Sequence, residues 1–299
     1  MTLQTKADLA LIVVALVWGI TFLPMGEALK TNGVFVMLFW RFFLSGIFMS
    51  LVALKLAKKF DINSVKYGVV LGVVLFSSFA FQTFALKLTY SSTVAFITGL
   101  ECVMVPFIAA ACFRQGVSVF AIVGAFVAIF GLWFLSDAKL GLGFGELFAL
   151  LCAVFYALYT VLNGHFVVKC ELYTLVCTVF FVIAIISFGC AFVFENGVIP
   201  VLDEPFFRAI VITVVFGTIF CYFLQTAMQR YTTATKAALF FSLEPVSAGF
   251  VGYYFGAEIL TLWQIFGAAM IICGVLISEL GAYLLSSFKT KSKEANRSY

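Results

Sequence analysis

Apolar residues fall into ten nearly uninterrupted runs, separated by short segments that hold charged or turn-forming residues. A helix needs about 20 residues to cross roughly 30 Å of hydrocarbon, and each run is close to that length. The predicted spans are residues 8–28, 33–54, 67–87, 91–113, 118–136, 144–165, 171–194, 207–228, 233–256 and 261–285. The longest connections lie near 55–66 and 195–206. The pattern therefore predicts an all-α integral membrane protein with ten transmembrane helices and no separate soluble domain.

Composition agrees with this prediction, since 64% of the 299 residues are apolar and only 11% are charged. Soluble domains carry about 25% charged residues, so a soluble enzyme is excluded. The first run follows Lys6 and Asp8 and has no evident small-residue cleavage site, which favours a retained signal-anchor helix.

The basic residues indicate how the spans are oriented. With the N-terminus inside, 13 Lys and Arg residues lie on the cytoplasmic side and four, Lys30, Lys87, Lys139 and Arg208, lie outside. This asymmetry predicts cytoplasmic N- and C-termini and a multi-pass protein of the cell inner (plasma) membrane. The basic tail Lys289–Arg297 is then expected to contact anionic membrane lipids rather than nucleic acid.

An internal repeat appears when the chain is compared with itself at an offset of 143 residues. Residues 82–136 align with 225–279 without a gap, and thirteen positions coincide, including Gln82 with Gln225 and Glu101 with Glu244. About four or five matches are expected by chance in so biased a composition. We therefore predict two repeats, residues 1–138 and 139–299, each with five helices. Because five is odd, the second repeat enters the membrane from the opposite side, an arrangement typical of secondary transporters.

Several short motifs resemble those of the bacterial drug/metabolite transporter superfamily, with its duplicated EamA-type domains. They are Trp18-Gly19-Ile20-Thr21-Phe22, Phe39-Trp40-Arg41-Phe42, Gly145-Glu146-Leu147, the run from Ala153 to Tyr159, Glu244-Pro245, and the glycine-containing end from Gly256 to Gly274. The resemblance covers essentially the whole chain and implies a ten-helix exporter or importer of small metabolites, often amino acids. The sequence departs from the family pattern at Cys102, which stands where the second half has Pro245, and a proline follows at Pro106 instead.

Three charged residues fall inside predicted spans, where charge is costly and usually functional. Glu101 and Glu244 lie ten and eleven residues into spans four and nine, so both are expected near the midplane, facing one cavity from opposite sides. Arg41 lies in span two, at a depth where it could compensate one carboxylate. The functional interpretation is a proton-coupling or cation-binding carboxylate, and the alternative is a structural Glu–Arg pair. For an amino-acid zwitterion, Arg41 would face the carboxylate and a glutamate the ammonium group.

Amides and aromatic residues add candidates around these charges. Gln82 and Gln225, each followed by threonine, are expected to point inward, for substrate binding or for hydrogen bonds between helices. An aromatic pocket is predicted from five residues, namely Trp18, Trp40, Tyr156, Tyr159 and Tyr222. Trp18 and Tyr156 are the preferred candidates because they occupy corresponding places in the first span of each half.

Small residues form stripes in spans five and ten, which are expected to pack on each other or across a homodimer. They are Gly124, Ala128 and Gly131 in one span, and Gly267, Gly274, Ser278 and Gly281 in the other. The glycine-rich segment 141–145 lacks the Lys-Ser/Thr ending of a phosphate loop and is interpreted as a joint between the halves. With one histidine and no CxxC pair among eight cysteines, we expect no metal site and no cofactor.

These observations predict a secondary active transporter that exports amino acids or related small metabolites, with protons as the candidate coupling ion. A facilitative or uptake carrier of a cationic or zwitterionic metabolite is the near alternative. A membrane-embedded lipid-modifying enzyme is the alternative from another class, and the sequence shows no nucleophile–base pair to support it.

Overall fold

The computed structural model describes residues 3–56, 61–114, 116–135 and 143–295, with side chains placed up to residue 278 and at Gly281. All regular elements in these ranges are helical. In chain order the elements are α1 (Leu3–Ala28), α2 (Val34–Leu56), α3 (Ile62–Leu88), α4 (Ser91–Thr98), α5 (Glu101–Phe113), α6 (Val119–Leu135), α7 (Phe144–Phe166), the 3-10 turn η1 (Val167–Lys169), α8 (Leu172–Phe194), α9 (Glu204–Val211), the π-helix η2 (Ile212–Phe220), α10 (Cys221–Met228), α11 (Ala234–Phe241), α12 (Glu244–Phe255) and α13 (Leu262–Ala295).

Seven helical stretches among the described residues are long and apolar enough to cross a membrane. They are α1, α2, α3, α4 with α5, α7 with η1, α8, and the stretch α9–η2–α10. Two further helical segments, Val119–Leu135 and Leu262–Ser278, are also apolar but are shorter than these seven. The predicted spans agree with the observed helices to within a few residues, except that α13 continues ten residues beyond the predicted end at 285. The chain is a helical membrane protein.

Two of the predicted spans are broken in the middle. Span 91–113 divides into α4 and α5 around Gly99 and Leu100, and span 233–256 divides into α11 and α12 around Ser242 and Leu243. The two breaks lie 143 residues apart, at the repeat offset. Both breaks lie inside predicted spans, and the segment Ser91–Phe113 still counts as one apolar helical stretch.

Polar contacts at the end of the bundle that carries the N-terminus, the N-terminal end, join loops distant in the sequence. Lys236 forms an ion pair with Asp8 at 2.9 Å. The guanidinium of Arg230 donates to the carbonyl of Cys170 at 2.6 Å. The amide of Glu171 donates to Ser64 Oγ at 2.7 Å.

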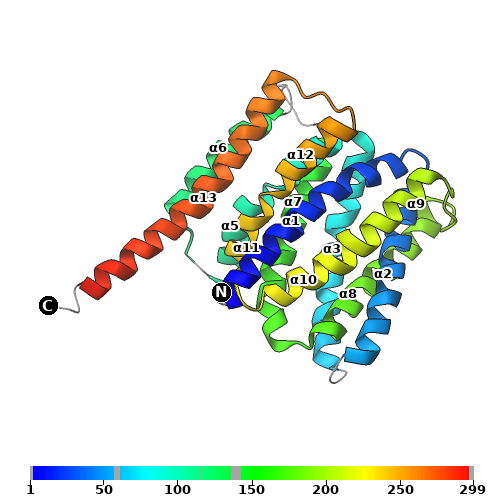
Figure 1. Cartoon of the computed structure of the whole chain (residues 1–299), viewed down its shortest axis with the longest axis horizontal. Helices are drawn as coiled ribbons and strands as arrows, with labels where there is room; N and C mark the ends of the chain where they lie inside the picture. Colours follow the sequence, from blue (N-terminus) through cyan, green and yellow to red (C-terminus); the bar gives the residue numbers. More distant parts are fainter. Residues whose placement is uncertain (1–2, 57–60, 115, 136–142, 296–299) are drawn as a thin grey trace.

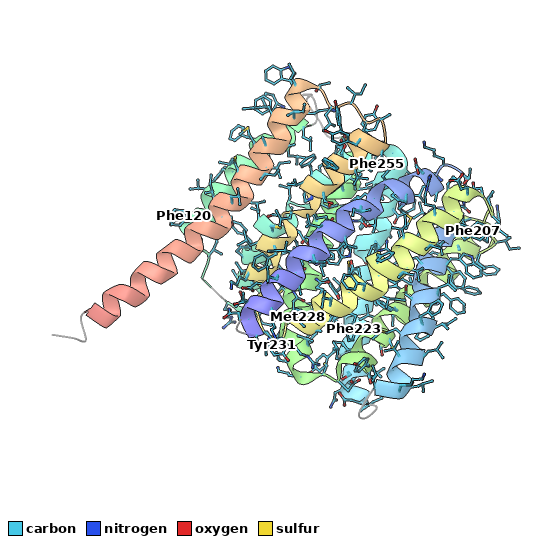
Figure 2. All side chains as sticks on the ribbon, in the orientation of Figure 1. Phe120, Phe207, Phe223, Met228, Tyr231 and Phe255 are labelled. Atoms are coloured by element: carbon cyan, nitrogen blue, oxygen red, sulfur yellow. The ribbon has the colours of Figure 1, made fainter. Side chains whose placement is uncertain are left out.

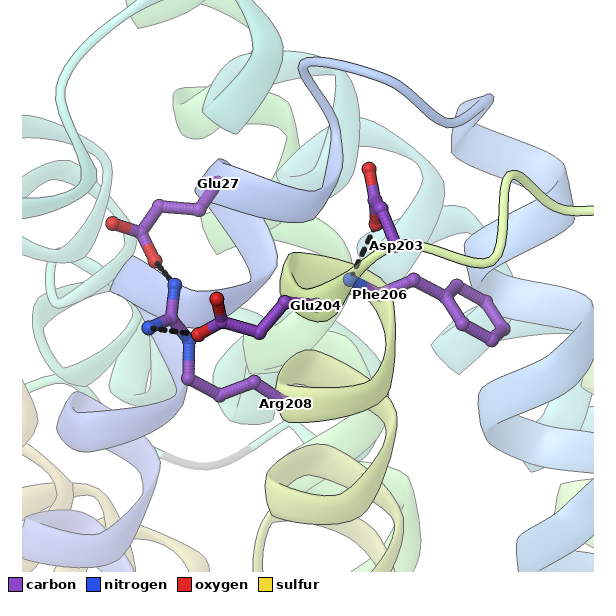
Figure 3. Close-up of polar contacts among 5 residues, drawn as sticks. All are labelled: Glu27, Asp203, Glu204, Phe206 and Arg208. Carbon is purple, nitrogen blue, oxygen red and sulfur yellow. Dashed lines mark hydrogen bonds and ion pairs between the residues drawn. The ribbon is translucent and has the colours of Figure 1, made fainter.

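A second set of contacts closes the opposite end, the far end. Arg208 of α9 pairs with Glu27 of α1 and with Glu204 (Figure 3). Glu195 accepts hydrogen bonds from two backbone amides in the first turn of α2. Glu258 accepts three hydrogen bonds from the start of α4, two from backbone amides and one from the Ser91 hydroxyl. These carboxylates satisfy amides that have no partner within their own helices and are favoured there by the helix dipole.

Helices α6 and α13 lie side by side along one edge of the molecule (Figure 1). Their small residues face one another: a Cβ atom added at Gly131 would lie 2.7 Å from the carbonyl oxygen of Gly267, and Gly124 faces Gly274 in the same way. The stripes therefore pack on each other within one chain, which is one of the two packing modes expected from the sequence.

The outer surface of the helices is apolar, as expected for contact with lipid. Side chains such as Phe207 and Phe255 project away from the bundle (Figure 2), and Phe255 is 74% exposed. Residues 141 and 142 of the glycine-rich segment, Lys139 and the proposed boundary at 138–139 lie outside the described residues, as do the side chains of the basic tail.

Candidate functional site

A cavity lies at the centre of the bundle, where the two broken helices meet α1, α2, α3, α7 and α10. Its lining residues are Trp18, Thr21, Phe22, Arg41, Ser78, Phe79, Gln82, Thr98, Gly99, Glu101, Cys152, Tyr156, Tyr222, Phe241 and Glu244. Six of the seven residues predicted to form the site are among them, and the seventh, Gln225, contacts Tyr156. The cavity volume is about 30 Å³, enough for roughly two water molecules. In this conformation the site is nearly closed.

Both predicted carboxylates stand at the start of a helix next to this cavity. Glu101 is the first residue of α5 and Glu244 the first residue of α12. At the first break Gly99 and Leu100 keep helical φ and ψ, and the amides of Cys102, Val103 and Met104 donate to the carbonyls of Gly99 and Leu100. The break is therefore a tightened turn, and the following amides have backbone partners. Glu101 is only 3% exposed, and its Oε2 atom has no hydrogen-bond partner. The site thus contains a buried carboxylate oxygen that is free to bind a proton or a cation.

Arg41 lines the same cavity but does not pair with either glutamate. Its Nε–H group donates to Thr218 Oγ1 at 2.7 Å, and its guanidinium carbon lies 4.5 Å from the ring centroid of Phe79. Among the described residues no carboxylate oxygen lies within 4.0 Å of its nitrogens. The expected Glu–Arg compensation is therefore not formed; a hydroxyl and an aromatic face hold Arg41 instead.

Four of the five residues predicted to form an aromatic pocket lie together, and Trp40 does not. Trp18 packs against Tyr156 and Tyr222, with ring centroids 5.8 and 5.1 Å away, and Tyr159 contacts both tyrosines. Trp40 was wrongly assigned to this group. Its indole donates to the carbonyl of Val198 near the far end, because the side chain points toward the 195–203 connection rather than inward.

The two repeated amides both face the interior. Gln82 lines the cavity. Gln225 is fully buried and accepts a hydrogen bond from the Tyr156 hydroxyl at 3.4 Å, while its Nε2 atom has no partner. Gln225 thus links two helices, as one of the two sequence interpretations expected.

A π-helix contributes polar contacts that sequence reasoning missed. In η2 the carbonyl of Gly217 accepts from the Trp18 indole at 2.9 Å, and the next residue, Thr218, holds Arg41. π-helical turns often mark functional sites. The only available signal was the run Ile212–Phe220, rich in β-branched residues, which does not distinguish a π-helix from an α-helix.

Close backbone approach shapes the site at two glycines. A Cβ atom on Gly19 would lie 2.6 Å from the carbonyl oxygen of Glu244, so α1 can approach α12 closely only because Gly19 has no side chain. A Cβ atom on Gly99 would lie 2.6 Å from Cγ of Pro245, so the two breaks touch each other.

Among the described residues, no group of three or more His, Cys, Asp or Glu side chains is placed to hold a metal ion. The cysteines form no disulfide bond in the part of the chain that the structure describes. The arrangement can therefore bind charge through Glu101, Glu244 and Arg41, and apolar or cationic groups through the aromatic residues.

Comparisons with known proteins agree with this architecture. The model of the EamA-like transporter family matches residues 5–137 and again 143–280. A protein of Archaeoglobus fulgidus described as an uncharacterized transporter is 31% identical over 274 residues, covering 92% of this chain and 86% of the relative. The uncharacterized transporter YyaM of Bacillus subtilis is 26% identical over 277 residues, covering 86% and 87% of the two chains. A solved protein structure superposes with a TM-score of 0.70 at 20% identity, covering 94% of this chain and 99% of that one, and is therefore similar in fold.

Proposed function

Because this chain belongs to the EamA-like transporter family, we propose that it is a secondary active transporter of small metabolites, most specifically an exporter of amino acids or related compounds. The observation that carries the proposal is the pair of repeat-related carboxylates at the breaks of α4–α5 and α11–α12. Irregular turns that carry polar groups beside a central site resemble the broken helices that bind substrates and ions in secondary transporters.

The proposed topology has ten crossings in two inverted repeats, residues 1–138 and 139–299. In this proposal the protein lies in the inner membrane of the cell, with both termini in the cytoplasm. The polar contacts support the sides assigned from the sequence. Loops assigned to the cytoplasm, such as those of Asp8 and Lys236, contact one another at the N-terminal end. Loops assigned outside, such as those of Glu27 and Arg208, meet at the far end.

The charges in the cavity suggest the class of substrate. Two carboxylates and one guanidinium give a formal charge of −1 when all are ionised, which one bound cation neutralises. An amino-acid zwitterion adds no net charge, so it would bind together with one proton. In this assignment Arg41 binds the substrate carboxylate, a glutamate binds the ammonium group, and the other glutamate binds the coupling proton.

Transport would proceed by alternating access. A cavity of about 30 Å³ is too small for an amino acid, so the helices around it would have to move apart to admit one. Rocking of the two repeats about the touching breaks would open the site to one side at a time.

Flux measurements test the proposal. Proteoliposomes are loaded with a mixture of radiolabelled amino acids, and efflux is measured with and without an imposed pH gradient. The wild type should release label faster with the gradient, and E101Q and E244Q should lose this efflux while remaining folded. E204Q is the matched control, since Glu204 is exposed at the far end, and it should behave like the wild type.

Each outcome has a distinct meaning. Wild-type rates in both E101Q and E244Q would contradict the role of the carboxylates. Efflux that does not respond to the gradient would indicate the facilitative carrier. If no amino acid is released, comparing the metabolites released by cells with and without the protein identifies the substrate class instead.

A further inference from the structure

A line of buried polar side chains runs from the central cavity toward the N-terminal end, between α7 and α10. On α7, Tyr156, Thr160 and Asn163 follow at spacings of four and three residues, so they share one helix face. On α10 and its C-cap, Gln225 and Gln229 are four residues apart and share a face in the same way. We call Thr160, Asn163, Gln225 and Gln229 the α7–α10 seam.

The seam bridges two helices that are not closely packed. Helix α7 packs against α3, α4 and α5, whereas α10 packs against α1 and α8. The two helices meet through long polar side chains, by the Tyr156–Gln225 hydrogen bond and by the donation of the Asn163 amide to Gln229. An interface of this kind separates more easily than one built on close backbone packing.

The seam is fully buried and its hydrogen bonding is incomplete. Asn163 and Thr160 are 0% exposed and Gln229 is 1% exposed. One polar atom in each of the four seam residues has no partner: Thr160 Oγ1, Asn163 Oδ1, Gln225 Nε2 and Gln229 Nε2. Buried polar atoms are normally paired, by protein or by water, so four unpaired atoms along one interface call for an occupant. Water is the occupant whose donors and acceptors fit all four.

The α7–α10 seam lies between the central cavity and the N-terminal end. Tyr222 lines both the central cavity and a second, tighter space. The other residues around this second space are Tyr159, Asn163 and Thr226 and the apolar Leu175, Val176, Val179 and Phe180. This second space has no room for a water molecule in the present conformation. At the N-terminal end, the seam leads to Arg230, whose Nε atom is buried without a partner.

Ionisable groups occur at both ends of the seam and not within it. Glu101 and Glu244 stand at the cavity end, with the hydroxyls of Tyr156 and Tyr222. At the N-terminal end the groups around the connection between α7 and α8 are Arg230, His165, Lys169, Glu171 and Asp61. Between the two ends the described side chains are uncharged: the hydroxyl and amide groups of the seam face the apolar Leu175, Val176, Val179 and Phe180 of α8. The polar groups can hold water molecules, and none of these side chains can keep a proton.

The far end offers a contrast. There the half-buried Glu195 and the buried Glu258 have their oxygens satisfied by helix amides and a hydroxyl. The unpaired buried atoms nearer that end are single hydroxyls of Ser92, Thr93 and Ser187, on α4 and α8. They do not form a line between two helices.

We propose that the α7–α10 seam is the water-filled path along which protons travel between the N-terminal end and Glu101 and Glu244 when α7 and α10 separate. A hydronium ion at the N-terminal end passes its proton along the seam waters to a glutamate oxygen, which forms an O–H bond while water is regenerated; release runs in reverse. This inference rests on the proposed function, because it assigns the route by which the coupling ion reaches that site.

Hydroxyl-radical footprinting tests the hydration of the seam without transport. Radicals formed from water oxidise the side chains that water touches, and mass spectrometry locates the product. Tyr159, although only 1% exposed, should be oxidised in the wild type, whereas the equally buried Phe42 should not. In N163L, oxidation of Tyr159 should fall roughly tenfold, because one of the polar groups that hold the water is lost.

Matched variants separate hydration from packing. N163S keeps a polar group and should retain most of the oxidation at Tyr159. T160V removes an unpaired hydroxyl at nearly constant volume and should lower it, whereas S187A removes an unpaired hydroxyl outside the seam and should not. Absence of Tyr159 oxidation in the wild type, or equal oxidation in T160V and S187A, would overturn the proposal.

Flux provides a second readout that distinguishes the two proposals. The proteoliposomes contain a trapped pH dye and labelled amino acids. Two processes are compared: net proton-coupled efflux, and exchange of labelled for unlabelled amino acids at equal pH. Because exchange moves no net proton, T160V and N163L should slow net efflux more than exchange. Equal slowing of both would identify a structural seam. Loss of flux in E101Q and E244Q with normal flux in N163L would overturn the seam alone, and normal flux in both E101Q and E244Q would overturn the proposed function.

Discussion

The two broken helices offer a comparison between segments that share a position in the repeat and differ in sequence. In α4–α5 the break is formed by Gly99 and Leu100, and α5 begins at Glu101. In α11–α12 it is formed by Ser242 and Leu243, and α12 begins at Glu244. Each half therefore provides a helix start with a carboxylate beside the central cavity.

The residues that follow each glutamate show what causes the break. Pro245 occupies the first turn of α12, where proline is well accommodated. The corresponding Cys102 has a backbone N–H, which donates to Gly99, and its thiol donates to the carbonyl of Ala238 at 2.7 Å. The first break therefore forms without a proline at this place, and the two segments cross where Gly99 meets Pro245.

The crossing should depend most strongly on Gly99. In G99A the new Cβ atom would lie 2.6 Å from Pro245 Cγ, and such overpacking typically costs about 1–3 kcal/mol. Thermal unfolding in detergent measures the effect. G189A is the matched control, since no atom lies within 4 Å of a Cβ there, and it should be neutral or slightly stabilising. Equal stability of G99A and the wild type would show that the breaks do not depend on this contact.

The two carboxylates should differ in their effect on stability. Glu101 is buried with an unpaired oxygen, whereas Glu244 is partly exposed to the cavity. Replacing an unpaired buried carboxylate by a neutral amide should stabilise E101Q by about 1 kcal/mol, and E244Q should change less. Unfolding of both variants in the same detergent measures the difference. A larger gain in stability for E244Q would mean that burial destabilises the carboxylate of Glu244 more than that of Glu101.

Substitutions at the residue after each glutamate test whether the breaks and transport depend on proline. P245A should cost about 1 kcal/mol or less, since it loses a favourable first-turn proline. C102P should cost about 1–3 kcal/mol, since it loses the hydrogen bonds of both the Cys102 amide and the Cys102 thiol. Both should keep their breaks and their flux. Thermal unfolding and efflux measure this, and loss of transport in P245A with normal folding would show that the proline itself shapes the site.

The sequence predicted the helices and the main candidate residues because these depend on local patterns. Hydrophobic run lengths located the spans, and the repeat placed Glu101 opposite Glu244. The partner of Arg41 could not be predicted, because Thr218 and Phe79 approach it only after three helices pack. The same holds for the breaks, which depend on contacts between segments 143 residues apart.

The smallest effects concern two exposed caps that occupy similar places in the halves. Asp61 caps α3 and Asp203 caps α9, each through hydrogen bonds to backbone amides of the first turn. A hydrogen bond from Ser64 lowers the pKa of Asp61, and one from Thr31 lowers the pKa of Asp203, both from an ordinary value of 3.8. A carboxyl group whose pKa is lower in the folded state stabilises the protein above its unfolded pKa, and this contribution disappears as the pH falls through the folded value.

D61N and D203N should therefore lower the unfolding temperature slightly at neutral pH, and the difference from the wild type should shrink below about pH 4, where the wild-type carboxyls also become neutral. Unfolding in detergent as a function of pH measures both variants. D203N should have the larger effect, because the carboxylate of Asp203 joins two segments, through Thr31, while that of Asp61 bonds only within its own first turn. A larger effect of D61N would mean that the cap of the first half contributes more to stability than the link between the halves.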